Sequence, residues 1–117
     1  MKNLILTLLV ILIITNCNKT TETPLLLPTA AEPSAKLHNN RGIEYFNKGE
    51  YLEALIQFTQ ANVADSTTGE IYFNLGLMQH LNGNQEKVKN LFKKAQNFAD
   101  GNKKIIESKL IKKYLAP

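Results

Sequence analysis

The chain has 117 residues, a net charge of +4 and 44% hydrophobic residues, so it has room for one small domain with a modest core. Its single cysteine excludes an internal disulfide, and no metal-ligand spacing is present. The charge is uneven: residues 41–70 hold two basic and five acidic side chains, whereas 87–113 hold nine lysines and two acidic ones. The lysine-rich end suits an acidic partner, a membrane surface or the acidic end of another copy, although a solvated face that maintains solubility is the simpler interpretation.

The first 16 residues have the pattern of an export signal. Lys2 is followed by a mostly apolar run, 4–14, which matches the core of a signal peptide and is short for a membrane span. Residues 14–17, Ile-Thr-Asn-Cys, resemble the lipobox of bacterial lipoproteins, with Asn16 in place of the usual Gly, Ala or Ser. The resemblance implies that residues 1–16 are cleaved off and that Cys17 is acylated. A free or buried thiol is the weaker interpretation, because the lone cysteine follows the apolar run directly.

An acylated Cys17 implies a lipoprotein anchored to a membrane of the bacterial cell envelope, facing the periplasm or the cell surface. Two or three acyl chains anchor a protein stably, since each buried methylene contributes about 0.8 kcal/mol. Residues 17–34 are then predicted to be a disordered tether, because prolines favour extended chain there and no helical or strand period is present. The apolar stretch 25–27 within this tether either packs on the domain or enters the membrane interface.

From residue 35 the apolar positions follow a helical period. Helices are predicted near 36–48, 51–64, 70–82 and 85–98. Gly49 and Gly83 each offer the left-handed residue that ends a helix. A final amphipathic helix is predicted over 103–115, with six apolar side chains: Ile105, Ile106, Leu110, Ile111, Tyr114 and Leu115.

The helical part of the chain repeats itself. Four residues recur 34 positions further on: Gly42, Gly49, Phe58 and Ala61 as Gly76, Gly83, Phe92 and Ala95. Only small residues fit where two helices cross closely, so Gly42 and Gly76 are predicted to mark crossings, with Phe58 and Phe92 filling the space around them. This period and residue pattern resemble the tetratricopeptide repeat (TPR) family.

The resemblance covers two whole repeats, 35–68 and 69–102. It implies an all-α fold, an α-solenoid of two TPR-like helix-turn-helix repeats plus a C-terminal capping helix, 103–115. The chain departs from the family pattern at His38, Arg41, Ser66, Gln79 and Asp100. Since two repeats are fewer than the three usually needed for stability, the capping helix or a second copy is expected to complete the core.

In TPR proteins the first helix of each repeat lines a groove that binds peptides. Asparagine amides in such a groove pair with a peptide backbone, and apolar side chains form pockets. The alternative is that the groove is covered by the capping helix, the tether or a second protomer. Carried over to this sequence, the partner-binding positions are Asn39, Asn40, Ile43, Phe46 and Asn47, then Phe73, Asn74, Leu77, His80 and Leu81.

The sequence contains no recognisable catalytic constellation. His38 and His80 stand at different phases of their repeats, and neither pairs with a carboxylate or cysteine at ligand spacing. A phosphate loop and the aromatic–basic alternation of single-strand binders are also missing. No cofactor, metal or nucleic acid is therefore expected.

These features predict a protein that is not an enzyme. The first hypothesis is a membrane-anchored protein–protein interaction module, an adaptor or assembly factor that binds a protein or peptide partner in the envelope. The second is a self-associating structural lipoprotein without a peptide groove, a homo-oligomer in which the acidic first repeat of one copy meets the lysine-rich end of another. A salt-sensitive dimer would favour the second hypothesis.

Overall fold

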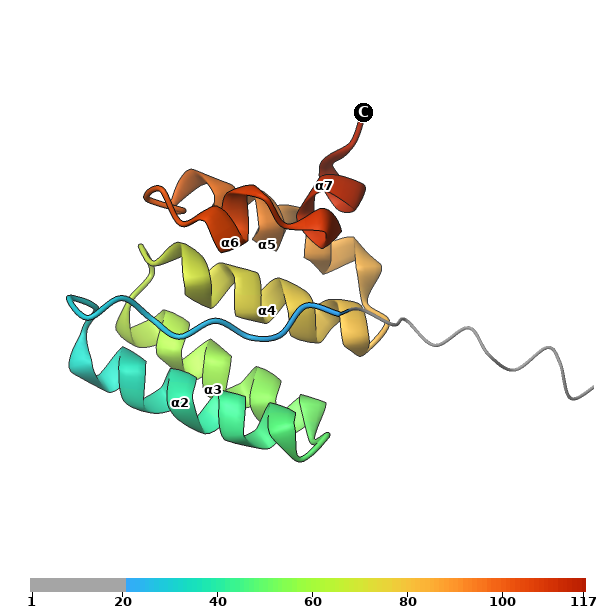
Figure 1. Cartoon of the computed structure of the whole chain (residues 1–117). Coiled ribbons are helices and arrows are strands. Elements are labelled where there is room, and N and C mark those ends of the chain that lie inside the picture. The colour runs from blue at the N-terminus through green and yellow to red at the C-terminus, as the bar shows by residue number, and fades with distance from the viewer. Residues whose placement is uncertain (1–20) are drawn as a thin grey trace, which may run out of the picture.

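The computed structural model describes residues 21–117, which form an all-α fold (Figure 1). Helices account for 68% of these residues, and none of residues 21–117 is in a strand. No helix in this part of the chain has the length and hydropathy needed to cross a membrane. The predicted signal peptide and Cys17 lie outside the described residues. The helices are α2 (Pro33–Asn47), α3 (Tyr51–Ala64), α4 (Gly69–Leu81), α5 (Gln85–Asn97), α6 (Lys103–Ile106) and α7 (Lys109–Leu115).

The first four helices form two hairpins, α2 with α3 and α4 with α5 (Figure 1). Each hairpin turns at a glycine in the left-handed region, Gly49 with φ of 75° and Gly83 with φ of 81°. A side chain at either position would be strained, so these two glycines set the tight turns. The four helices predicted from the periodicity are confirmed, with every end within three residues of its predicted position.

The two hairpins share one packing device. A Cβ atom added at Gly42 would lie 2.5 Å from Cε1 of Phe58, and one added at Gly76 would lie 2.4 Å from Cε1 of Phe92. Both phenyl rings are fully buried. No side chain fits at either distance, so glycine allows the helices of each hairpin to approach until the ring fills the gap. The prediction that Gly42 and Gly76 mark helix crossings is confirmed.

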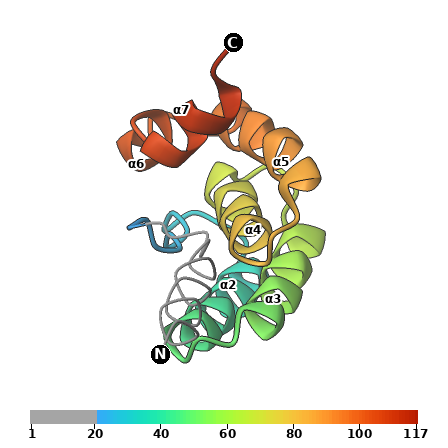
Figure 2. The same cartoon turned by 90° about the vertical axis from the view of Figure 1, so that its right-hand side faces the viewer.

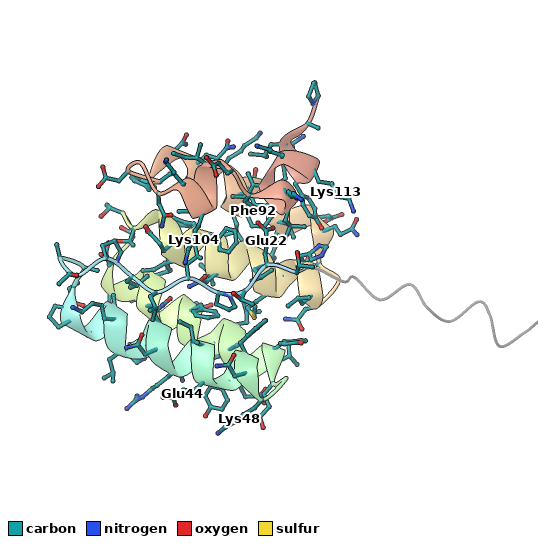
Figure 3. All side chains as sticks on the ribbon, in the orientation of Figure 1. Glu22, Glu44, Lys48, Phe92, Lys104 and Lys113 are labelled. Carbon is teal, nitrogen blue, oxygen red and sulfur yellow. The ribbon has the colours of Figure 1, made fainter. Side chains whose placement is uncertain are left out.

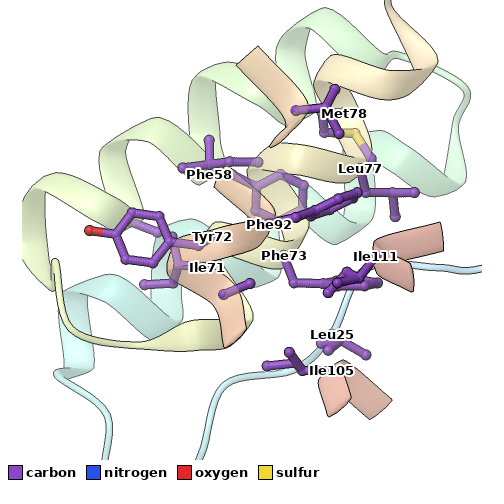
Figure 4. Close-up of a cluster of buried hydrophobic side chains, with 14 of the residues drawn as sticks. Leu25, Phe58, Ile71, Tyr72, Phe73, Leu77, Met78, Phe92, Ile105 and Ile111 are labelled. Carbon is purple, nitrogen blue, oxygen red and sulfur yellow. The ribbon is translucent and has the colours of Figure 1, made fainter. Parts of the chain in front are cut away.

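Helix α4 lies at the centre of the molecule. It is flanked by α2 and α3 on one side and by α5, α6 and α7 on the other (Figure 2). Every residue from 69 to 78 is buried. The hydrophobic core surrounds this helix and includes Phe73, Leu77 and Met78 from α4, Phe92 from α5 and Ile111 from α7 (Figure 4).

The C-terminal part covers the second hairpin as two short helices, where the sequence predicted one continuous helix. Ser108 separates them, and its Oγ accepts a hydrogen bond from the backbone N–H of Ile111 at 3.1 Å. Serine favours this capping role over a position inside a helix, so a new helix begins there. The change of direction lets Ile105 of α6 and Ile111 of α7 both reach the core, where each is fully buried.

The chain before α2 was expected to be a disordered tether as far as residue 34. In the structure, residues 22–27 instead run in an extended conformation alongside α2 and α4, and a turn closed by the Ala31 N–H and the Pro28 carbonyl oxygen leads into α2 (Figures 1 and 2). Helix α2 also begins earlier than expected, at Pro33. Glu32 caps it, because its Oε2 accepts hydrogen bonds from the N–H of Ala35 at 2.9 Å and from the hydroxyl of Ser34 at 2.7 Å.

Candidate functional site

Two buried asparagines hold the main chain of Leu25. The backbone N–H of Leu25 donates to Oδ1 of Asn74 at 2.7 Å. The carbonyl oxygen of Leu25 accepts from Nδ2 of Asn74 and from Nδ2 of Asn39, each at 2.9 Å. A further bond, from Nδ2 of Asn74 to Oδ1 of Asn39 at 2.8 Å, links the two amides. Both backbone groups of one extended residue are thereby satisfied by side chains of two helices.

The side chains on either side of Leu25 alternate as in a strand. Leu25 is 8% exposed and belongs to the core, whereas Leu26 is 71% exposed. Leu27 packs partly against the core again. Alternation with a period of two is the property of extended chain that places successive side chains on opposite faces. Residues 21–27, the groove segment, thus pack on the domain through Leu25 of their apolar stretch, one of the two roles predicted for it.

The asparagine partner of Asn74 differs from the one suggested by the 34-residue period. That period pairs Asn74 with Asn40, but Asn40 is exposed and Asn39 is fully buried. One residue along a helix rotates the side chain by about 100°. The two amides meet because they reach toward the same point from neighbouring helices, so they need not occupy equivalent positions of their repeats.

The ten predicted groove positions divide into three groups. Asn39, Phe73, Asn74, Leu77 and His80 are buried; Ile43, Phe46 and Leu81 are partly buried; Asn40 and Asn47 are exposed. Phe73 is 1% exposed and its ring stacks on that of Phe92, with centroids 6.0 Å apart (Figure 4). Phe73 and Leu77 are thus core side chains with almost no exposed surface, which does not match the expectation that they offer apolar pockets to a peptide.

His80 attaches the C-terminal helix to α4. Its Nδ1 lies 2.7 Å from the hydroxyl oxygen of Tyr114, and the two rings meet edge to face. Burial lowers the pKa of His80, and the charge of Lys113 lowers it further, while Glu22 acts in the opposite direction. Burial also raises the pKa of Tyr114. His80 is thus better suited to a neutral packing contact than to a charged peptide ligand.

An open cleft lies beside the groove segment, on the side of α6 and α7. Its volume is about 1000 Å³. Residues 21–26 form one wall, Phe73 and His80 contribute to the lining, and four lysines stand on the opposite side. Glu22 crosses between the walls, since its Oε2 accepts a hydrogen bond from the N–H of Leu110 at 3.1 Å. The four lysines of this lysine cleft are Lys103, Lys104, Lys109 and Lys113.

Sequence reasoning missed Leu25, Glu22 and the cleft lysines as parts of one site. The three consecutive leucines were a usable signal for Leu25, because an apolar stretch in a polar tether is costly to leave in water. The lysines were recognised only as part of a basic C-terminal end, and Glu22 gave no local signal. Glu22 and Leu110 are 88 positions apart in the chain and come together only in the fold.

A smaller hollow lies between α3 and α5, away from the groove segment. It has a volume of about 340 Å³ and is lined in part by Leu55, Leu75 and Leu91. On α3, two large apolar side chains stand in solvent one turn apart, Leu52 at 62% exposure and Ile56 at 56%. These two exposed side chains belong to neither the groove segment nor the lysine cleft.

Comparisons of the chain with protein-family models, with curated proteins and with solved structures found no significant match. Within residues 21–117, no group of three or more His, Cys, Asp or Glu side chains is arranged to hold a metal ion. The function must therefore be inferred from the contacts of the chain's own residues.

Proposed function

We propose that the protein is a lipid-anchored, TPR-like interaction module whose groove binds an extended peptide. The single observation that carries this proposal is the pair of asparagines, Asn39 and Asn74, that hydrogen-bond the backbone of Leu25. Amide side chains that satisfy both the N–H and the C=O of one extended residue recognise main chain, which any peptide can offer. The groove segment then acts as an internal ligand in the place of a partner.

The same contacts define the partner's chemistry. It would be an extended segment with a leucine-sized apolar side chain at the residue held by the two asparagines, because Leu25 is buried in the core at this point. The next residue could be of any type, since Leu26 is largely solvent-exposed. A partner must compete with a tethered ligand whose effective concentration is of millimolar order, so it would bind weakly unless it makes further contacts.

Cys17 gives the proposed module its location. It follows an apolar run directly and lies only four residues before Thr21, the first described residue. Acylation there would hold the module at a membrane of the bacterial envelope, where it would act as an adaptor or assembly factor rather than as an enzyme. Equal glycine–phenylalanine crossings in the two hairpins support the TPR-like assignment, and α6 with α7 takes the place of the capping helix.

Peptide binding can be tested with a labelled copy of the groove segment. Fluorescence polarisation would measure binding of a fluorescent peptide of sequence Thr-Glu-Thr-Pro-Leu-Leu-Leu to the full chain in detergent. The Leu25→Asp variant should release its own segment and bind the added peptide at least about tenfold more tightly, since competition is removed. Leu26→Asp is the matched control, because Leu26 is 71% exposed and its substitution leaves the segment in place.

Two outcomes would distinguish a peptide-binding groove from a segment that is a permanent part of the fold. Tighter binding by Leu25→Asp, lost on adding Asn74→Ala, would support a groove for extended peptides. A folded Leu25→Asp variant that binds the peptide no better than the Leu26→Asp control would mean that the groove segment is a fixed part of the fold.

Self-association is the second candidate function. The apolar surface of α3 favours it, because Leu52 and Ile56 share one side of the helix and Val63 on the same helix is 84% exposed. Sedimentation of the full chain at low and high salt distinguishes two forms of association. A dimer held by α3 would persist in salt, whereas one between the acidic first hairpin and the lysine-rich end would dissociate.

A further inference from the structure

The exposed side of α6 and α7 is strongly basic. Between residues 103 and 113 the chain presents five exposed lysines and one exposed glutamate, Glu107. Four of these lysines line the lysine cleft, whose other wall is the groove segment. Figure 3 shows Lys104 and Lys113 on this face together with Glu22. Lysine ammonium groups are compact, well-hydrated charges that suit phosphate groups at a surface.

An exposed apolar side chain lies in the same cleft. Leu26 lines it and is 71% exposed, because the asparagines fix the alternation that turns Leu25 inward and Leu26 outward. Lysines beside an exposed leucine form a surface with the two properties that hold proteins to the interface of an anionic bilayer: charge attraction and a shallow apolar insertion.

The fixed groove segment shortens the connection to the membrane. A disordered tether over 17–34 would let the domain stand some tens of ångströms from its anchor. With Leu25 clamped and Glu22 bonded to Leu110, the chain is attached to the domain from the start of the described residues, and Thr21 stands only four positions after Cys17. The four Cα-to-Cα steps from Cys17 to Thr21 span about 13 Å at most when fully extended. This distance is close to the Debye length of about 10 Å at 0.1 M salt.

We infer that the face formed by α6, α7 and residues 21–26 lies against an anionic membrane surface. The inference rests on the proposed anchoring at Cys17, which limits the distance between the domain and the bilayer. It adds to that proposal the orientation of the domain. The lysines contact headgroup phosphates, and Leu26 enters the interface. The opposite face, with α3 and its exposed Val63, is turned away from the bilayer (Figure 2).

The test uses the membrane-extracted full chain attached to vesicles of phosphatidylcholine, alone or mixed with phosphatidylglycerol. A bilayer-sensitive fluorophore is placed at Leu26→Cys, or at Val63→Cys as the control on the opposite face. We expect lipids spin-labelled in the headgroup to quench the probe at position 26 several-fold more in the anionic vesicles. Quenching at position 63 should stay low in both, and the difference at position 26 should disappear in about 1 M salt, where the Debye length is ~3 Å.

A matched pair of variants tests the lysines themselves. One changes Lys103, Lys104, Lys109 and Lys113 to Gln; the other changes Lys87, Lys89, Lys93 and Lys94 of α5, which are also exposed, to Gln. Both remove four positive charges. Loss of quenching in the first variant and its retention in the second would support the inference. Equal loss in both would show attraction by total charge and would overturn it.

The remaining outcomes separate docking from anchoring. Flotation with neutral vesicles depends on the anchor alone, since charge attraction is absent. If Cys17→Ser does not change flotation, lipid anchoring at Cys17 is refuted. A chain that floats but shows the same quenching at positions 26 and 63 would refute the docked orientation. Protection of the probe at position 26 by polyglutamate, without quenching by anionic vesicles, would assign the lysine face to an acidic protein partner instead.

Discussion

Oδ1 of Asn74 accepts a hydrogen bond of 2.7 Å from the backbone N–H of Leu25, a residue 49 positions earlier in the chain. This contact converts the chain ahead of α2 from a linker into part of the domain. It is reinforced by Asn39, whose Nδ2 donates to the carbonyl oxygen of the same leucine at 2.9 Å. Buried polar side chains need hydrogen-bond partners, and each of these two fully buried amides has partners in the protein.

Replacing Asn74 should therefore cost more than one hydrogen bond. Asn74→Ala leaves the N–H of Leu25 without its acceptor in a buried position, so we expect the free energy of unfolding to fall by about 1–3 kcal/mol. The groove segment should also become sensitive to protease. Urea unfolding and limited proteolysis measure the two effects. Asn40→Ala is the control, because Asn40 is exposed and a surface change of this kind should stay within about 0.5 kcal/mol.

The glycine crossings give a second prediction. Gly76→Leu should lower the free energy of unfolding by about 3 kcal/mol or more, because the new side chain overlaps the ring of Phe92. Thermal unfolding measures the loss. Gln96→Leu, an exposed change on α5, controls for added hydrophobicity. An unchanged melting temperature in Gly76→Leu would contradict the close approach of α4 and α5.

Those crossings were predictable from sequence because their cause is local to each hairpin. The spacing from Gly42 to Phe58 equals that from Gly76 to Phe92, and each pair joins the two helices of one turn. A glycine and a phenylalanine that recur at the same sequence separation indicate that the same helix–helix contact occurs in both hairpins. The helices themselves followed from the same period, since their apolar faces must pack against one another.

The position of the groove segment could not be predicted in the same way. Residues 21–27 have no helical period, and their contacts depend on Asn39, Asn74 and Leu110, which lie 14 to 88 positions away. The break at Ser108 was also not predicted. The apolar pattern of 103–115 fits one helix, but the serine caps a second helix and so divides the segment in two. Local patterns specify the elements, but contacts distant in sequence decide which surfaces remain open.

Phe73 shows the consequence for the candidate site. The TPR resemblance placed it on the open groove, whereas it is 1% exposed and packs on Phe92. Phe73→Ala should therefore lower the free energy of unfolding by about 3–5 kcal/mol through the cavity that it leaves. Phe98→Ala, at a position 38% exposed, should cost clearly less. If Phe73→Ala keeps the stability of the wild type but binds the peptide more weakly, Phe73 acts as part of the groove surface and not of the core.

Glu70 provides the last prediction, through pH. It is 3% exposed at the start of α4, and its Oε2 has no hydrogen-bond partner among the described residues. Burial raises its pKa above the ordinary value of 4.5, although a hydrogen bond from Asn102 acts in the opposite direction. The folded state therefore favours the protonated carboxyl, and the stability this provides below pH 4.5 is lost as the pH rises through the raised pKa.

Glu70→Gln should thus have a higher free energy of unfolding than the wild type near pH 7, and its advantage should shrink as the pH falls toward about 4. Urea unfolding across this range measures the difference. Glu86→Gln is the matched control, because Glu86 occupies the first turn of α5 as Glu70 does that of α4, but it is exposed. A Glu70→Gln variant that is less stable than the wild type at pH 7 would mean that the carboxylate is stabilised by its surroundings, and that burial does not control its charge.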